Sequence, residues 1–118
     1  MGRNRLPRYI RFMPQVNLFK PAGIPARHLE RVELTYDELE AVRLKDIEGL
    51  DQTDAAKKMK ISRTTYLRTL KGAREKIAEG LINGKAIMIE GGNYVCPRGL
   101  RRRRMLGYNR GLRRHFYK

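Results

Sequence analysis

The chain has 118 residues, about the size of one domain. Of its formal net charge of +15, five basic side chains lie in residues 1–20 and nine in residues 98–118, and neither end holds an acid. Such acid-free basic ends predict a polyanionic partner rather than solubility alone. The longest purely apolar run, residues 86–89, is too short to span a bilayer, and the single cysteine excludes an internal disulfide. We therefore expect a cytoplasmic protein.

The N-terminal segment is predicted to be an extended arm. Prolines at positions 7, 14, 21 and 25 prevent a continuous helix over residues 1–26. The large apolar residues between Ile10 and Phe19 are too numerous for a free linker. We expect this arm to pack on the domain with its arginines pointing outward, and disorder is the alternative.

A first helix is predicted to begin after Thr35 and to end at Gly49. Thr35 and Glu38 have the spacing of a capping box, in which each residue satisfies a backbone amide of the other. Gly49 suits the residue that follows a helix. The residues expected on the buried side are Leu39, Val42 and Ile47.

Two more helices follow, separated by a short turn. Asp51 is the expected N-cap of a short helix, and Ala55, Ala56 and Met59 form its narrow apolar seam. Ser62 is the expected N-cap of a longer helix over residues 63–82, which Asn83-Gly84 should end. One face of that helix repeats apolar residues at helical spacing: Tyr66, Leu70, Ala73, Ile77 and Leu81.

The stretch KAIMIE, residues 85–90, is a candidate strand. Residues 32–34 or 11–13 are its candidate pairing partners. Gly91-Gly92 should then end the folded part, and the tail beyond it mixes arginine, glycine and aromatic residues.

Two short helices joined by a tight turn, with the second one longer, predict a helix-turn-helix motif. In that motif the second helix enters the DNA major groove, where arginine and threonine can contact base edges. The expected base-facing residues are Arg63, Thr64, Leu67, Arg68 and Lys71, while Ser62, Lys57 and Lys58 suit phosphates. The alternative is that these polar side chains form an ordinary solvated helix face that binds no partner.

Three stretches also resemble a small uncharacterised prokaryotic helix-turn-helix family: FMPQVNLFKPAG (12–23), LTYDELEAVRLKDIEGLDQTDAAKKMKISRTTY (34–66) and INGKAIMIEGG (82–92). The motif of that family is similar to region four of bacterial sigma factors. The resemblance implies DNA binding without catalysis, with Ser62, Arg63, Thr64, Thr65 and Arg68 on the recognition helix.

The chain departs from the family pattern at several positions. Lys60 stands in the turn where the family usually has glycine, and Arg11 stands where a cysteine often precedes the phenylalanine. Cys96 begins what looks like half of a C-P-x-C knuckle whose second cysteine is missing. A metal-binding or redox role is therefore not inferred for this chain from the resemblance.

Catalytic motifs are absent from the sequence. His28 and His115 are far apart, neither lies near a cysteine or a base in any motif, and there is no Walker loop or G-x-G-x-x-G pattern. We expect no enzymatic activity, no cofactor and no metal.

The sequence as a whole predicts a mainly α protein in three parts. These are an extended basic arm (1–33), a three-helix helix-turn-helix domain similar to sigma region four (34–92) with a short strand at 85–90, and a basic tail (93–118). Further nucleic-acid contacts are expected from the arginines of the ends: Arg3, Arg5, Arg8, Arg11, Arg101, Arg102, Arg103, Arg104, Arg113 and Arg114.

The predicted function is regulation of transcription by binding duplex DNA. RNA polymerase and a second copy of the chain are further candidate partners. The main rival is RNA binding, for example on the ribosome, because arginine-rich ends with aromatic residues also suit unpaired RNA. A membrane-surface role is weaker, because glycines break any amphipathic period in the tail.

Overall fold

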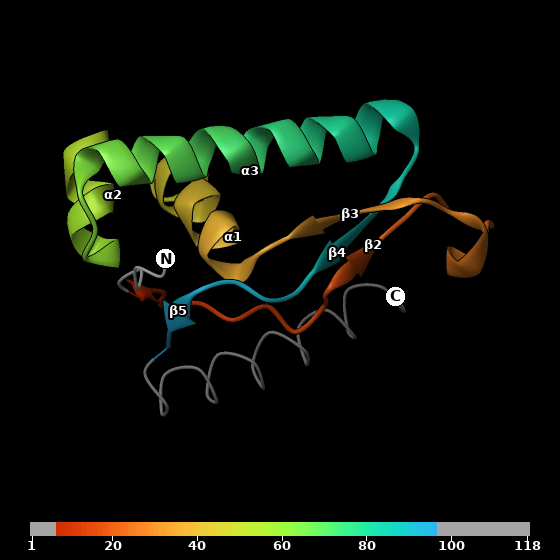
Figure 1. Ribbon diagram of the computed structural model, residues 1–118, viewed down its shortest axis with the longest axis horizontal. Coiled ribbons are helices and arrows are strands. Elements are labelled where there is room, and N and C mark those ends of the chain that lie inside the picture. Colours follow the sequence, from red (N-terminus) through yellow and green to blue (C-terminus); the bar gives the residue numbers. More distant parts are fainter. Residues whose placement is uncertain (1–6, 97–118) are drawn as a thin grey trace, which may run out of the picture.

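The computed structural model of the protein describes residues 7–96, and these form a mainly α domain edged by short strands (Figure 1). The predicted fold class is confirmed. The helices are α1 (Tyr36–Val42), a single π-helical turn η2 (Arg43–Ile47), α2 (Gln52–Met59) and the long α3 (Arg63–Asn83). A 3₁₀ turn, η1 (Ala26–His28), lies at the end of the molecule opposite α2.

The predicted helix starts are confirmed. The Thr35 hydroxyl accepts a hydrogen bond from the Glu38 amide at 3.4 Å, and the Thr35 amide donates to the Glu38 carboxylate at 3.0 Å. Asp51 and Ser62 cap α2 and α3 by accepting from the amides three residues ahead, at 2.8 and 3.1 Å. These caps satisfy amides that the first turn of a helix leaves without partners.

The turn between α2 and α3 has a left-handed residue. Lys60 has φ 58° and ψ 44°, a conformation that costs an L-residue about 1–2 kcal/mol. Its ammonium group lies 4.8 Å from the centre of the Tyr9 ring, a cation–π contact that partly offsets this cost. The turn is therefore tied to the N-terminal arm.

A first core holds the three helices together. Its buried residues are Ala41, Leu44, Ala55, Ala56, Met59, Tyr66 and Leu70. Small alanines on α1 and α2 let these helices approach α3 closely. The buried Tyr66 hydroxyl donates to the carbonyl of Ala41 at 2.7 Å, so the polar end of this large ring is satisfied.

The prediction that Ile47 is buried was wrong, because this residue is 77% exposed. Ile47 ends the π-helical turn η2, whose wider winding changes the direction in which successive side chains point. Leu44 in the same turn stays buried. The α-helical spacing used for the prediction does not apply across this turn.

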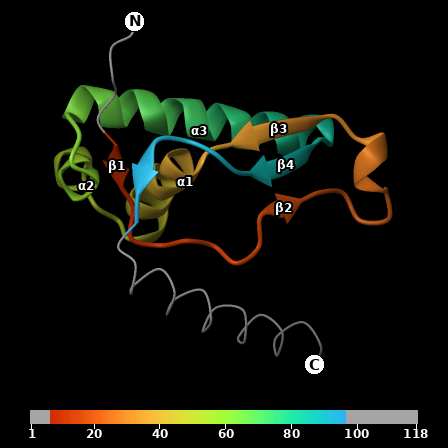
Figure 2. The same cartoon turned by 60° about the horizontal axis from the view of Figure 1, so that its bottom comes forward.

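A three-stranded sheet packs under the other half of α3 (Figure 2). β4 (Ala86–Ile89) is central, with β2 (Leu18–Phe19) antiparallel on one side and β3 (Arg31–Leu34) parallel on the other. The predicted strand and its pairing with residues 32–34 are confirmed. The alternative pairing with residues 11–13 was wrong, since Leu18 and Phe19 occupy that edge.

A second core fills the space between this sheet and the helices. Leu34, Ala73, Ile87 and Ile89 form its buried centre. Leu81 was expected on this face but is 73% exposed, and Gly80 is buried there instead. A Cβ atom on Gly80 would lie 2.5 Å from Ile87 Cγ1, so the glycine allows the close approach of α3 and β4.

The arm packs on the domain in extended form, as predicted. Ile10 and Met13 are buried, and β1 (Arg8–Tyr9) pairs in parallel with β5 (Tyr94–Val95). The folded part therefore continues beyond Gly91-Gly92, where the sequence predicted its end. A contact between segments as distant in the sequence as β1 and β5 could not be deduced from local spacing.

Candidate nucleic-acid interface

The outer face of α3 carries an exposed polar stripe near its N-terminus. Arg63, Thr64, Arg68 and Lys71 are all exposed, and together they are called the α3 stripe. The opposite face of the helix is fixed in the two cores by Tyr66, Leu70 and Ala73. The stripe is thus held on a rigid element and faces solvent.

The members of the α3 stripe differ in their partners. Arg63 donates to the Gln52 side chain of α2 at 2.8 Å, and Lys71 lies 3.7 Å from the Glu75 carboxylate. Both interactions are exposed, so they contribute little energy and can be exchanged for another partner. Among residues 7–96, Arg68 forms no ion pair.

Leu67 and Thr65, also predicted to face nucleic acid, are only half-buried rather than exposed. Leu67 packs against the first core. It also lines a shallow hollow of about 510 Å³ on one flank of α3. The Thr65 hydroxyl accepts from the Ser62 hydroxyl at 2.9 Å, so these two side chains form part of the helix start.

Lys57 and Lys58 lie exposed in the last turn of α2. Lys60 is exposed in the turn that follows, so three cationic side chains precede α3. Their position beside the α3 stripe gives this end of the described chain a positive edge. Such an edge can attract a phosphate backbone over roughly the Debye length of 8–10 Å.

Arg8 was expected to point outward toward nucleic acid, and this expectation was wrong. The residue is only 4% exposed, because pairing of β1 with β5 turns its side chain toward α1 and α3. Its Nε lies 3.9 Å from an Asp37 oxygen, a loose ion pair. Arg8 therefore belongs to the interior of the described chain.

Arg11 is exposed as predicted, and its backbone is fixed by a buried acid. The Arg11 amide donates to Glu40 at 3.0 Å, and Glu40 is only 2% exposed. Arg43 donates to both oxygens of the same carboxylate, at 2.9 and 2.8 Å. Hydrogen bonding to Glu40 raises the pKa of Arg43, and the same carboxylate holds the backbone of the arm on α1 through the Arg11 amide.

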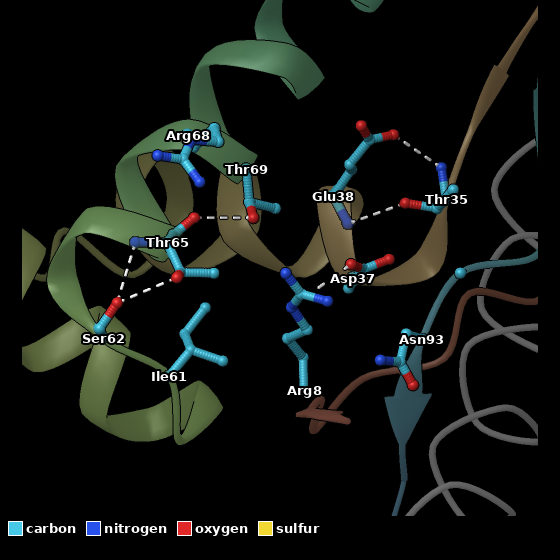
Figure 3. A pocket seen from close by; sticks show the side chains of 11 residues that line it. Arg8, Thr35, Asp37, Glu38, Ile61, Ser62, Thr65, Arg68, Thr69 and Asn93 are labelled. Atoms are coloured by element: carbon cyan, nitrogen blue, oxygen red, sulfur yellow. Dashed lines mark hydrogen bonds and ion pairs between the residues drawn. The ribbon is translucent and has the colours of Figure 1, made fainter. Parts of the chain in front are cut away.

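A cavity of about 570 Å³ lies on the other flank of α3 (Figure 3). Its walls come from four parts of the chain: β1, the start of α1, the first turns of α3, and the loop after β4. Its lining residues are Arg8, Thr35, Asp37, Glu38, Ile61, Ser62, Thr65, Arg68, Thr69, Gly92 and Asn93. The cavity therefore shares Arg68 with the α3 stripe.

Sequence reasoning missed this cavity. None of Asp37, Thr69 and Asn93 was singled out from the sequence as a candidate site residue. The acid Asp37 inside the Thr35–Glu38 capping box and the Gly91-Gly92 pair were the available signals. Neither signal indicates which distant residue lies opposite.

The remaining predicted contacts, Arg3, Arg5, Arg101, Arg102, Arg103, Arg104, Arg113 and Arg114, lie outside the described residues, as does His115. His28 is exposed on η1. In residues 7–96 no three His, Cys, Asp or Glu side chains gather as metal ligands would. The absence of catalysis, cofactor and metal stays a prediction. None of the helices in this range has the length and apolar character needed to cross a bilayer.

Comparison with known proteins gives the family. Residues 1–97 match the family described as "Protein of unknown function DUF134", so the chain belongs to that family. A UPF0251 protein of Halothermothrix orenii is 53% identical over 94 residues, which cover 80% of this chain and 70% of the relative.

Other relatives carry the same name. One from Caldanaerobacter subterraneus is 58% identical over 87 residues, covering 74% of each chain. One from Methanosarcina acetivorans is 52% identical over 94 residues, covering 80% of this chain and 84% of the relative. No solved structure matches the chain.

Proposed function

We propose that this member of the DUF134 family is a helix-turn-helix regulator of transcription that binds duplex DNA with α3 in the major groove. The observation that carries the proposal is the exposed α3 stripe on a helix whose opposite face is fixed in both cores. The major groove is wide enough to admit an α-helix. Here α2 packs against α3 in the first core, and in the motif the first helix crosses the DNA backbone while the second lies in the groove.

Each member of the interface has a chemical role in this proposal. Arg68 can donate two hydrogen bonds to guanine O6 and N7, and Thr64 can contact a thymine methyl or a base edge. Lys57 and Lys58 would neutralise backbone phosphates and fix the register of α3. RNA polymerase and a second copy of the chain are the candidate protein partners of such a regulator.

Selection of bound duplexes from a random pool, followed by measurement of Arg68→Ala, tests the proposal. The variant should lose about 1–3 kcal/mol on the selected site and relax the preference at one base position. Arg27→Ala is the matched control, because Arg27 is exposed on η1 at the opposite end of the molecule. If Arg68→Ala loses the same binding free energy on selected and on random duplexes, Arg68 contacts only phosphates, and the proposal that it reads bases is wrong.

RNA binding is the second candidate, and the charge of the two ends favours it. Residues 1–20 and 98–118 carry fourteen of the basic side chains and no acid. Arginine with interspersed aromatic residues binds unpaired or structured RNA by phosphate contacts and stacking. In that case the ends, rather than α3, would determine affinity and selectivity.

A further inference from the structure

We infer that the cavity between β1, α1 and the start of α3 binds a small zwitterion, such as an α-amino acid. Its volume of about 570 Å³ lies within the range of small-molecule sites. The inference rests on the cavity itself and holds whether or not α3 binds DNA.

Two buried, oppositely charged side chains in the wall have unmet hydrogen-bonding capacity. The Arg8 and Asp37 side chains are 5% and 9% exposed. Arg8 Nε and Nη1, and Asp37 Oδ1, have no hydrogen-bond partner among the described residues. The other carboxylate oxygen, Asp37 Oδ2, lies 3.9 Å from Arg8 Nε, which is too long for a hydrogen bond. Buried charged groups that lack hydrogen bonds are costly even in a loose ion pair, so the geometry favours an occupant that donates to Asp37 and accepts from Arg8.

The two charges require complementary groups from that occupant. Asp37 Oδ1 can only accept, which suits an ammonium group, whereas Arg8 can only donate, which suits a carboxylate. Arg68 adds a second cation at the wall, and Figure 3 shows the Arg8 guanidinium between α3 and Asp37. A simple anion such as phosphate would face the Asp37 carboxylate as well, which disfavours it.

The surrounding walls can fix the rest of the ligand. Thr69 donates its hydroxyl hydrogen to the Thr65 carbonyl at 2.9 Å, which leaves the hydroxyl oxygen able to accept from a ligand. Gly92 has φ 107° and lies against α1, where a Cβ atom would collide with Asp37 Oδ1. Gly92 therefore permits the close fit of this wall.

The experiment titrates the full chain, without DNA, with each standard amino acid at millimolar concentration. Binding is followed by thermal shift and by calorimetry. Acetate, methylammonium and inorganic phosphate are the single-charge probes. At least one amino acid should raise Tm and bind, and each single-charge probe should bind at least tenfold more weakly.

Variants locate the site. Asp37→Asn should weaken amino-acid binding at least tenfold, while Asp54→Asn, an exposed acid on α2 outside the cavity, should leave binding unchanged. Thr69→Val should weaken binding several-fold, and this variant serves as the test if Asp37→Asn does not fold. The inference is overturned if no amino acid binds, if phosphate binds as tightly, or if folded variants of both positions bind normally.

Discussion

At the scale of single residues, Tyr66 links α3 to α1. Its hydroxyl donates to the Ala41 carbonyl at 2.7 Å in the interior, just before the chain enters the π-helical turn η2. Tyr66→Phe leaves that buried carbonyl without this partner, and we expect it to lower the free energy of unfolding by about 1–3 kcal/mol. Urea unfolding measures the change. Tyr9→Phe is the control, because the exposed Tyr9 ring keeps its contact with Lys60 and should change stability little.

Tyr66 also makes the free energy of unfolding depend on pH. Burial is the main cause that raises the pKa of Tyr66 above its ordinary 10.0, so the folded state favours the neutral phenol. This contribution to stability is fully present below the ordinary pKa and is lost as the pH rises through the folded-state pKa. Unfolding free energies measured between about pH 9 and 11 should fall less for Tyr66→Phe than for the unmodified chain. An identical fall in both proteins would contradict this assignment.

Residue-level features were predictable from the sequence where their cause is local. The caps at Thr35, Asp51 and Ser62 depend on residues three positions ahead, so short spacing revealed them. Arg8 and Asp37 lie together only because β1 pairs with β5, and no local pattern contains that contact. The sequence therefore located the α3 stripe but not the cavity beside it.

At the scale of elements, two glycines of α3 have opposite roles. A Cβ atom on Gly80 would lie 2.5 and 2.8 Å from two Ile87 atoms, whereas at Gly72 the nearest atom, of Glu38, is 3.5 Å away. Gly80→Ala should destabilise the protein by about 1–3 kcal/mol through overpacking against β4. Gly72→Ala should stabilise it by up to about 1 kcal/mol, because alanine favours the helix.

Thermal or urea unfolding of the two variants makes this comparison. The two substitutions add the same methyl group to the same helix, so a difference in sign isolates the packing of α3 on β4. Destabilisation of similar size at both glycines would contradict the described packing.

The elements themselves could be predicted to different extents. Strong helical periodicity and caps located α2 and α3, and the apolar run at residues 85–90 located β4. The two-residue strands β1, β2 and β5 have no period long enough to detect, and they form because distant segments meet. The π-helical turn likewise interrupts a pattern that resembles an ordinary helix, which is why Ile47 was misplaced.

At the scale of the whole molecule, charge is distributed unevenly along the chain. The ends in residues 1–20 and 98–118 hold fourteen basic side chains and no acid, so most non-specific affinity for nucleic acid should come from them. If about eight of these charges meet phosphates, the log–log salt dependence of binding to duplex DNA should have a slope of about −7.

Removing residues 98–118 should flatten that slope by several units and leave the sequence preference intact. Binding to duplex DNA measured over a range of salt concentrations, with the full and shortened chains, gives both slopes. An unchanged slope would show that the positive charge at residues 98–118 does not contact phosphates.

The central claim is that α3 recognises duplex DNA, and competition between a duplex DNA pool and structured RNA at physiological salt tests it most directly. The measurement compares the full chain, the chain without residues 98–118, and Arg68→Ala. We predict that the full chain prefers DNA, that the shortened chain keeps its sequence preference, and that Arg68→Ala loses it. A full chain that prefers RNA, with binding abolished by truncation and unaffected by Arg68→Ala, would contradict the account.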